Sequence, residues 1–557
     1  MSSLKKKRAA RPKGRQAHAE DIEQVLVYLG DETPRRDRLI EYLHRIQDDV
    51  GHLPAGLLVA LAKVMRLATA EVYEVASFYH HFDVVKDPEQ APPPLTIRVC
   101  ESVSCELAGA RELIDALART MGDGVRVQAV PCVGRCEQAP VAVVGTCPAG
   151  EADVSKLQGM VSDGRTNDEP PATAADYKTY RLNGGYTRLQ RIVEDDSPES
   201  KEAIIATLEH AGLRGLGGAG FPAGRKWRIV SGYPGPRLMA VNIDEGEPGT
   251  FKDRYYLERD PHRFFEGMLI AAHVVGIEKI YVYLRDEYAG VRALLERELD
   301  ALLASPPVAL PEIELRRGAG AYICGEESAM IESIEGKRGM PRLRPPYIAE
   351  LGLFGRPTLE HNMETLYWVP EILDKGADWF CSHGRRGRKG LRSFSVSGRV
   401  NRPGVHLAPA GISVRELIDE YCGGMLEGHS LKAYFPGGAS GGILPASLDD
   451  LPLDFDTLQQ HGCFIGSAAV IILSDKDSVR QAALNAMHFF AHESCGQCTP
   501  CRVGTEKAAA LMSRPDWDVP TLEDLCRVME DASICGLGQA APNPLRCALK
   551  YFPEEFA

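Results

Sequence analysis

The chain has 557 residues, of which 44% are hydrophobic and 25% charged, and its formal net charge is −13. Such a composition is typical of globular protein, and the length allows three or four domains. The acidic balance excludes a nucleic-acid binder because no basic excess is available for phosphate, and no apolar run approaches the ~18 residues of a membrane span. We therefore expect neither a nucleic-acid partner nor membrane insertion.

The N-terminal part is basic and then helical. Residues 1–20 are rich in Lys and Arg, and no apolar segment follows them as it would in a signal peptide. We expect a disordered tail there, with a transit peptide or a docking arm as alternatives. In residues 21–90, apolar side chains such as Leu39, Leu43 and Ile46 recur at helical spacing. This pattern predicts a helical N-terminal part.

Residues 91–161 contain the first group of cysteines. A predicted strand over 95–99 ends at Cys100, and another over 125–130 is followed by Cys132. A helix is predicted between them, over 110–119. The pairs Cys100-x4-Cys105 and Cys132-x3-Cys136 both begin where a strand ends, so two loops can converge on one site. Four thiolates suit a [2Fe–2S] cluster or zinc. We favour the cluster, with Cys147 outside it.

A polar segment over 162–180 predicts an interdomain linker, and residues 181–389 then alternate between helical and strand patterns. Their order predicts a mostly parallel sheet. The expected helices cover 201–211, 262–275 and 291–303, and the expected strands cover 237–243, 279–284 and 313–316.

A glycine-rich loop, Gly215-Leu216-Gly217-Gly218-Ala219-Gly220-Phe221, lies early in this α/β region. It satisfies G-x-G-x-x-G, but a helix precedes it where an ordinary Rossmann turn has a strand. Its backbone N–H groups, with Lys226 close behind, can still hold a phosphate or a flavin. A flexible hinge is the alternative.

Two acidic stretches follow in the same region. One is Asn242-Ile243-Asp244-Glu245-Gly246-Glu247 after a predicted strand, and the other is Gly325-Glu326-Glu327. Carboxylates at the end of a strand can accept hydrogen bonds from ribityl or ribose hydroxyls. Each stretch alone fits a solvated loop, but together with the glycine loop they favour a binding site.

The C-terminal third has two different predicted secondary structures. Residues 390–474 contain short strand-like runs with glycine turns, and Phe464–Leu473 predicts a buried strand, whereas residues 475–557 predict a helical bundle. Cys495-x2-Cys498-x2-Cys501 can ligate three corners of a [4Fe–4S] cluster, with zinc or free thiols as alternatives. Cys535, between Ile534 and glycines, is the best fourth ligand. Cys526 fits a core position of a helix.

The count of fifteen cysteines also bears on location. The number is odd and no export signal is evident, so a disulfide framework is not expected and a cytoplasmic location is.

At these motifs the sequence resembles a known family. Residues 214–227, 242–253, 318–328 and 493–502 resemble the NADH-binding 51-kDa-type subunit of respiratory complex I. Residues 21–147 resemble its 24-kDa-type partner, a helical piece with a thioredoxin-like [2Fe–2S] domain. Fusions of the two are familiar from diaphorase subunits of soluble hydrogenases and formate dehydrogenases.

The resemblance implies a multidomain α/β fold: a helical piece plus thioredoxin-like [2Fe–2S] domain, a Rossmann-like flavin domain, a β-grasp domain over 390–474, and a C-terminal helical [4Fe–4S] bundle. NAD(H) would lie over Phe221, with Glu247 and Glu327 nearby, so that Phe221 and Glu247 serve catalysis. Leu216, Arg344 and Tyr347 depart from residues frequent in the family. The implied FMN contacts are Gly215, Gly217, Lys226, Asn242, Asp244, Glu245, Glu326, Asn362 and Thr365.

The implied function is hydride exchange between NAD(H) and FMN, with electrons relayed through the two clusters to or from a catalytic partner. Residues 325–333 and 358–365, with His361, look most like formate dehydrogenases. We therefore expect a large partner subunit with a molybdenum or tungsten pterin site and further iron–sulfur clusters. A soluble hydrogenase or complex I is the alternative partner. A redox-inactive zinc scaffold and an interaction subunit without nucleotide turnover are rivals of another class.

Overall fold

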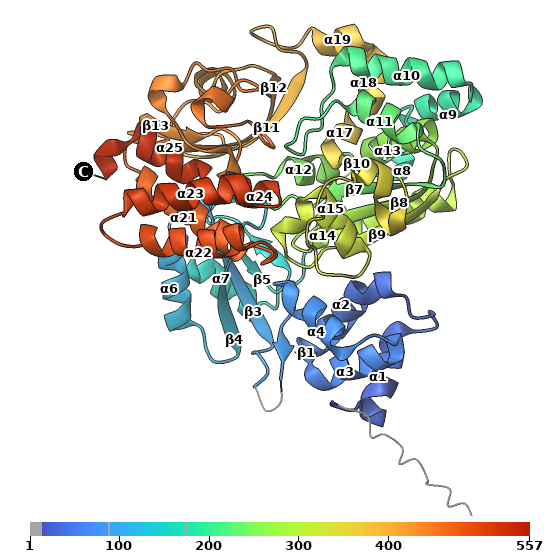
Figure 1. Cartoon of the computed structure of the whole chain (residues 1–557), viewed down its shortest axis with the longest axis horizontal. Coiled ribbons are helices and arrows are strands. Elements are labelled where there is room, and N and C mark those ends of the chain that lie inside the picture. Colours follow the sequence, from blue (N-terminus) through green and yellow to red (C-terminus); the bar gives the residue numbers. More distant parts are fainter. Residues whose placement is uncertain (1–13, 87–89, 173–174, 557) are drawn as a thin grey trace, which may run out of the picture. The chain divides into compact units, whose positions relative to one another are not determined.

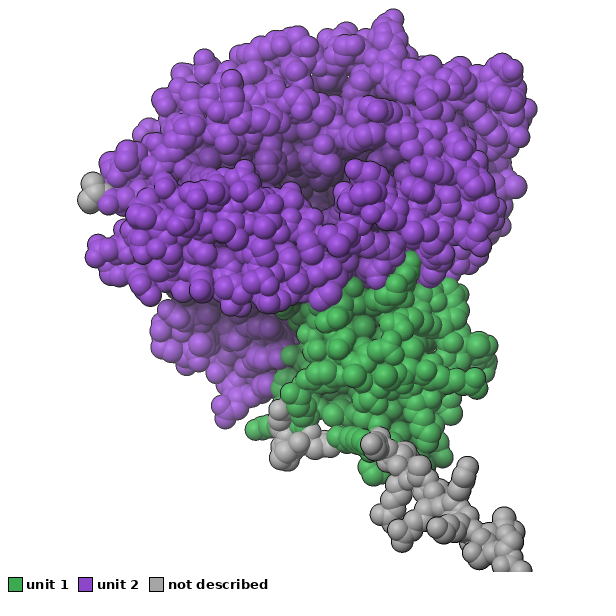
Figure 2. Space-filling model, viewed as in Figure 1, with its two compact units in different colours: residues 1–92, 335–338 green, residues 93–334, 339–557 purple. Residues whose placement is uncertain are grey.

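The computed structural model describes residues 14–86, 90–172 and 175–556 (Figure 1). The chain divides into two compact units, one of residues up to Pro92 with Glu335–Arg338, the other of Pro93–Ile334 and everything from Gly339 on (Figure 2). The predicted basic tail, residues 1–20, lies for the most part outside the described residues. No helix in the described ranges is both long and apolar enough to cross a membrane.

The first unit is helical, as predicted. Leu39, Leu43 and Ile46 occupy one face of α2 and are fully buried, because residues spaced by three or four lie on the same side of a helix. Two short strands pair in parallel beside the helices. Its elements are α1 (Ala19–Leu29), α2 (Leu39–Val50), β1 (Leu53–Pro54), α3 (Ala55–Met65), α4 (Thr69–Phe78) and β2 (Val84–Val85).

The second unit begins with a four-stranded sheet in the order β4-β3-β5-β6. Strands β3 and β4 are parallel, so their carboxyl ends meet at one edge of the sheet, where Cys100 ends β3 and Cys132 follows β4. The elements are β3 (Leu95–Cys100), α5 (Val103–Leu107), α6 (Ala110–Thr120), β4 (Val125–Val130), β5 (Ala142–Val144), β6 (Cys147–Ala149) and α7 (Val154–Ser162).

The predicted linker is anchored to both of its neighbours. Between α7 and α8, the Asp168 N–H donates to Thr146 Oγ1 at 3.1 Å, and an Asp168 carboxylate oxygen accepts from the Gly290 N–H at 2.8 Å. The segment therefore packs along the second unit, and its polar residues serve as attachment points.

The α/β region forms a parallel sheet in the order β10-β7-β8-β9. The chain runs outward from β7 to β9 and returns to β10 on the other side of β7, which makes the gap between the ends of β7 and β10 a topological switch point. The strands are β7 (Arg237–Ile243), β8 (Ile277–Leu284), β9 (Glu312–Arg317) and β10 (Thr358–Asn362).

Helices surround this sheet, and those predicted at 201–211, 262–275 and 291–303 are present. They are α8 (Tyr177–Leu182), α9 (Thr187–Glu194), α10 (Pro198–Ala211), α11 (Ala223–Ser231), α12 (Lys252–Arg259), α13 (Pro261–Val275), α14 (Ala289–Ala304), α15 (Glu327–Ile334), α16 (Ile348–Leu351), α17 (Met363–Tyr367), α18 (Val369–Lys375) and α19 (Ala377–Cys381).

Residues 391–474 form a mixed five-stranded sheet in the order β12-β11-β15-β13-β14. The strand predicted over Phe464–Leu473 begins only at Ala469, because Gly466 and Ala468 take left-handed backbone conformations that interrupt extended chain. The strands are β11 (Leu391–Gly398), β12 (Gly404–Pro409), β13 (Leu431–Phe435), β14 (Leu444–Pro445) and β15 (Ala469–Ser474).

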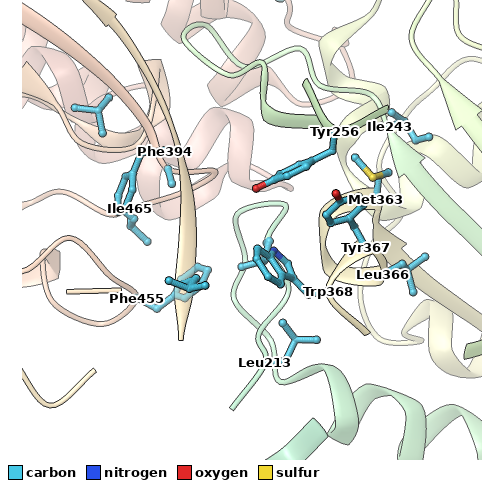
Figure 3. Close-up of a cluster of buried hydrophobic side chains, with 14 of the residues drawn as sticks. Leu213, Ile243, Tyr256, Met363, Leu366, Tyr367, Trp368, Phe394, Phe455 and Ile465 are labelled. Carbon is cyan, nitrogen blue, oxygen red and sulfur yellow. The ribbon is translucent and has the colours of Figure 1, made fainter. Parts of the chain in front are cut away.

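The C-terminal part is the predicted helical bundle. Its helices are α21 (Val479–His492), α22 (Thr499–Met512), α23 (Val519–Ala532), α24 (Gly536–Ala540) and α25 (Asn543–Tyr551). One apolar core continues from the α/β region into the five-stranded sheet (Figure 3). In it, Tyr256 and Trp368 belong to the α/β region, and Phe394, Phe455 and Ile465 to the sheet, so the two domains are packed as one body.

Candidate functional site

A cavity of about 320 Å³ lies at the switch point of the parallel sheet. Ligands bind at such a point because the loops leaving adjacent strands in opposite directions open a crevice there. Asn242 is the last residue but one of β7 and pairs in register with Asn362 at the end of β10. The lining residues are Gly217, Gly218, Ala219, Asn242, Asp244, Glu245, Gly246, Glu247, Thr250, Lys252, Asp253, Tyr322, Ile323, Gly325, Glu326, Asn362, Gly437, Ser440, Phe464, Gly466, Ser467, Gly536, Leu537 and Ala540.

The glycine loop closes on itself at one wall of this cavity. The Gly215 N–H donates to Phe221 O at 2.8 Å, and the Leu216 N–H donates to Thr365 Oγ1 at 2.9 Å. A Cβ on Gly217 would lie 3.0 Å from Asn362 Cβ. Within the described chain, the N–H groups of residues 217–219 make no hydrogen bond, and these three residues line the cavity. They are therefore available to an anionic or polar ligand.

The opposite wall is acidic. Asp244 Oδ2 is buried and has no hydrogen-bond partner among the described residues, and burial raises the Asp244 pKa well above its ordinary value. Burial, followed by the charge of Asp253, raises the pKa of Glu245 to about 7. Glu247 accepts from Ser440 N and Oγ at 2.7 and 2.8 Å and from the Tyr322 hydroxyl. A buried acceptor without a partner is the type of group that a ligand hydroxyl satisfies.

Among the described residues that line the cavity the cation is Lys252, whereas the sequence predicted Lys226 as a contact. Lys226 Nζ lies 2.9 Å from a Glu360 carboxylate oxygen and 3.0 Å from the Glu360 carbonyl, and it does not line the cavity. Lys252 does, and it pairs with Asp253 at 2.7 Å and Glu364 at 3.1 Å. Pairing with Glu360 therefore holds the Lys226 ammonium outside the cavity lining, and its role as an FMN contact stays a prediction.

Of the other residues predicted to contact the cofactor or the nucleotide, some line the cavity and some do not. Asn242, Asp244, Glu245, Glu247, Glu326, Asn362 and Gly217 line the cavity. Gly215, Phe221, Glu327 and Thr365 do not. Phe221 is 39% exposed with the Arg225 guanidinium over its ring, Glu327 pairs with Arg344 at 3.1 Å, and Thr365 supports the glycine loop from behind.

Sequence reasoning missed the contribution of the five-stranded sheet. Ser440 and Phe464 come from its loops and complete the cavity wall. The run Gly437, Gly438, Gly441 and Gly442 was the available signal, since it marks a place where backbone approaches another group closely.

The first group of four cysteines is assembled and buried. Cys100, Cys105, Cys132 and Cys136 are 1–4% exposed, and the sulfurs of Cys132 and Cys136 lie 3.3 Å apart. Contacts from Cys100 and Cys136, together with the positive charge of Arg285, hold the Cys132 pKa well below its ordinary value. Four clustered thiols without disulfides, one of them poised to ionise, suit the thiolate ligation of an iron–sulfur cluster.

Buried arginines join this site to the acidic wall of the cavity. Arg285 donates to the Cys132 carbonyl at 2.6 Å and also to the Glu245 carbonyl. Arg254 donates to the Gly134 carbonyl at 3.0 Å, and Tyr288 donates to Glu245 at 2.9 Å. The loop that carries Cys132 and Cys136 is therefore held one residue layer away from the cavity.

The second group lies at the other side of the cavity, in the C-terminal bundle. Cys498 precedes α22, Cys501 is in its first turn, and Cys535 precedes α24, whose residues Gly536, Leu537 and Ala540 line the cavity. Burial raises the pKa of Cys535 to about 12, and the neighbouring Cys495 thiol adds to the rise. A Cβ on Gly538 would lie 2.8 Å from Cys501 Cβ, so glycine permits this approach.

Cys526 and Cys547 lie apart from this group. Cys526 is buried in α23 with Leu522 and Met529, as its helical pattern predicted, and Cys547 is next to Cys463. The arrangement favours Cys535 as the fourth ligand, which remains a prediction.

Comparison with known proteins identifies the domains that carry these sites. Residues 208–371 match the Nuo51 FMN-binding domain, and residues 481–557 match the iron–sulfur binding region of NADH-ubiquinone oxidoreductase-F. Residues 27–165 match the thioredoxin-like [2Fe–2S] ferredoxin family, and residues 393–444 match the SLBB domain.

An NADH-quinone oxidoreductase protein of Rhizobium meliloti is 40% identical over 393 residues, which are 68% of this chain and 93% of that protein. The chain belongs to the family of NADH-quinone oxidoreductase flavoproteins. The mitochondrial NADH dehydrogenase [ubiquinone] flavoprotein 1 of Dictyostelium discoideum is 39% identical over 67% of this chain and 81% of its own length. A solved chain of an NAD⁺-reducing [NiFe]-hydrogenase is 31% identical, with a TM-score of 0.80, and the match covers 94% of this chain and 92% of that one.

The family confirms the predicted fold class and cofactors. The chain is an NAD(H) oxidoreductase subunit with FMN, a [2Fe–2S] cluster and a [4Fe–4S] cluster, and its domains favour these clusters over the zinc alternatives. The described residues fit these groups, since the cavity offers an unsatisfied buried acceptor at Asp244 and each set of four cysteines is brought to one place.

Proposed function

We propose that this chain is the diaphorase subunit of a larger enzyme, exchanging hydride with NAD(H) at the switch-point cavity and passing electrons through both cysteine sites. The observation that carries the proposal is the position of the cavity, with α24 of the second cysteine site in its wall and Arg285 linking its acidic wall to the first. When bound, FMN supplies the step between two-electron hydride transfer and one-electron clusters.

The residues that line the cavity would bind the flavin and fix its orientation. The N–H groups of residues 217–219 and the ammonium of Lys252 suit a phosphate, while Asp244 and Asn242 suit hydroxyls of a ribityl chain. Glu245, Glu247 and Glu326 make the cavity unfavourable for an additional 2′-phosphate. We therefore expect a strong preference for NAD over NADP, measured as the ratio of kcat/KM values; comparable turnover with both coenzymes would contradict it.

The glycine loop offers a direct test of the cavity. Gly217→Val adds a branched side chain where a Cβ alone would already lie 3.0 Å from Asn362 Cβ. We expect protein that lacks FMN but keeps both clusters, measured by flavin absorbance and electron paramagnetic resonance. Gly122→Val is the matched control, since a Cβ there would meet nothing within 4 Å and the residue lies outside the lining. Normal FMN content in Gly217→Val would contradict the assignment.

For the partner we propose a formate dehydrogenase catalytic subunit with a molybdenum or tungsten pterin site, in the cytoplasm. The residues around His361 support it, and that side chain is buried and accepts a 2.8 Å hydrogen bond from the Trp227 indole N–H. A hydrogenase partner is the second candidate, favoured by the likeness of nearly the whole chain to a subunit of an NAD⁺-reducing [NiFe]-hydrogenase.

The native complex decides between them. The purified complex is incubated with NAD⁺ and either formate or hydrogen, NAD⁺ reduction is measured, and the metal content is determined. Formate-dependent reduction with molybdenum or tungsten supports the first partner. Hydrogen-dependent reduction with nickel would replace it by the second and leave the diaphorase function standing.

A further inference from the structure

Two cysteines outside both cluster sites form a close pair. Cys463 lies in the loop between η8 (Gln459–His461) and β15, and Cys547 lies in α25. Their sulfurs are 3.5 Å apart although the residues are 84 positions apart in sequence. A disulfide has an S–S distance of about 2.05 Å, so the two sulfurs would have to approach each other by about 1.5 Å to form one.

The surrounding backbone leaves space for this pair. Gly442 has a φ of +81°, and a Cβ there would lie 2.6 Å from Cys463 Sγ and 3.1 Å from Cys547 Sγ. Any other residue would therefore push the sulfurs aside. Glycine at this position is explained by the two thiols, independently of the cavity that the neighbouring Ser440 lines.

The pair forms part of the wall of a second cavity, of about 330 Å³. Arg546 in its wall pairs with Glu530, the one carboxylate among the lining residues, so Lys550 supplies the excess positive charge. His461 and Asn543 add hydrogen-bonding groups. A small molecule of negative charge suits this composition.

The environment also favours a reactive sulfur. Contact with Cys463 lowers the pKa of Cys547, and the positive charges of Lys550 and Arg546 contribute in the same direction. Burial raises the pKa of Cys526 to about 11 and that of Cys422 to about 12, whereas at the equally buried Cys547 the neighbouring thiol and the cations outweigh the effect of burial. Because the thiolate is the nucleophile, Cys547 is the better attacking group.

We propose that Cys463 and Cys547 form a thiol–disulfide exchange site for a small anionic disulfide of the glutathione disulfide class. The Cys547 thiolate attacks one sulfur of the ligand, whose S–S bond breaks and releases one thiolate. Cys463, losing its proton to solvent, then attacks Cys547 Sγ and expels the second thiolate. Two protein thiols are oxidised to one disulfide, and one ligand disulfide is reduced to two thiols.

The site adjoins the flavin cavity without sharing its ligands. Phe464 follows Cys463 directly and lines both cavities, and Asn543 of α25 donates to the Ser440 carbonyl at 3.0 Å. The exchange chemistry does not depend on which catalytic partner the chain has.

The test uses the intact protein with its clusters and flavin. It is incubated with glutathione disulfide, free thiols are alkylated, and peptides are mapped by mass spectrometry without reduction. We expect a Cys463–Cys547 disulfide to form first. Cys463→Ser should trap one glutathione on Cys547, whereas Cys547→Ser should leave Cys463 unmodified. Cys526→Ser, a buried lone thiol of the same bundle, is the control and should oxidise like the parent.

Charge in the cavity is tested separately. Lys550→Gln should lower the rate with glutathione disulfide several-fold more than the rate with uncharged bis(2-hydroxyethyl) disulfide. Absence of the Cys463–Cys547 linkage in the parent protein would overturn the proposal. So would equal modification of Cys381 and Cys422, or an equal loss of rate with both disulfides in Lys550→Gln.

Discussion

The two groups of four cysteines differ in their surroundings more than in their ligands. Cys100, Cys105, Cys132 and Cys136 are all nearly inaccessible, whereas Cys495, Cys498 and Cys535 are only half-buried. The first group is tied by Arg285 and Arg254 to the acidic wall of the flavin cavity, and the second contributes α24 to that cavity directly. The more exposed group is therefore suited to pass electrons to a partner, and the enclosed group to exchange electrons with the cavity.

The largest expected effects come from replacing single cysteines, because each replacement should remove the signal of one cluster and leave that of the other. Cys535→Ser should abolish the four-iron signal in electron paramagnetic resonance and leave the two-iron signal, because Cys535 is next to Cys495 while no member of the enclosed group is. Cys132→Ser should do the reverse. Cys526→Ser is the control for the first variant and should keep both signals. Loss of the four-iron signal in Cys526→Ser would show that the ligand assignment is wrong.

The second prediction concerns the link between the enclosed site and the cavity. Arg285→Met removes a buried guanidinium that bonds the carbonyls of Cys132 and Glu245 and pairs with Glu287. Removing the guanidinium leaves two buried carbonyl acceptors unpaired at a cost of about 1–3 kcal/mol each, so the apparent melting temperature should fall by several degrees. Arg228→Met, which removes exposed pairs with Glu202 and Glu209, should change it little. An equal fall in melting temperature for the two variants would contradict a special role for Arg285.

The third prediction is a pH dependence of stability to which Glu245 contributes. Folding raises the pKa of Glu245 from 4.5 to about 7, so the folded state holds a proton that the unfolded state has released. Stability of the FMN-free protein should therefore fall as pH rises from about 4.5 to 7, by about 3 kcal/mol for this group. Glu245→Gln should make the fall in melting temperature over that range smaller; an unchanged slope would show that Glu245 does not contribute to it.

The sequence alone could locate both cysteine sites, because their spacing and the strand ends beside Cys100 and Cys132 are local features. It could also place most of the acidic wall, since Asp244 and Glu245 follow a strand of high apolar content. It could not show that Lys252 lines the cavity, because Lys226 and Lys252 are held by Glu360 and Glu364, more than a hundred residues away. The breaks in extended chain at Gly466 and Ala468 were likewise invisible in an apolar run.

The anchored segment between α7 and α8 has a consequence for assembly. It makes the thioredoxin-like domain and the flavin domain parts of one polypeptide, with Asp168 pinned to Gly290. Their docking is therefore intramolecular, at an effective concentration of roughly millimolar for a short connection. Dilution that separates two non-covalent subunits leaves this pair together, and the ratio of one domain to the other is fixed at synthesis.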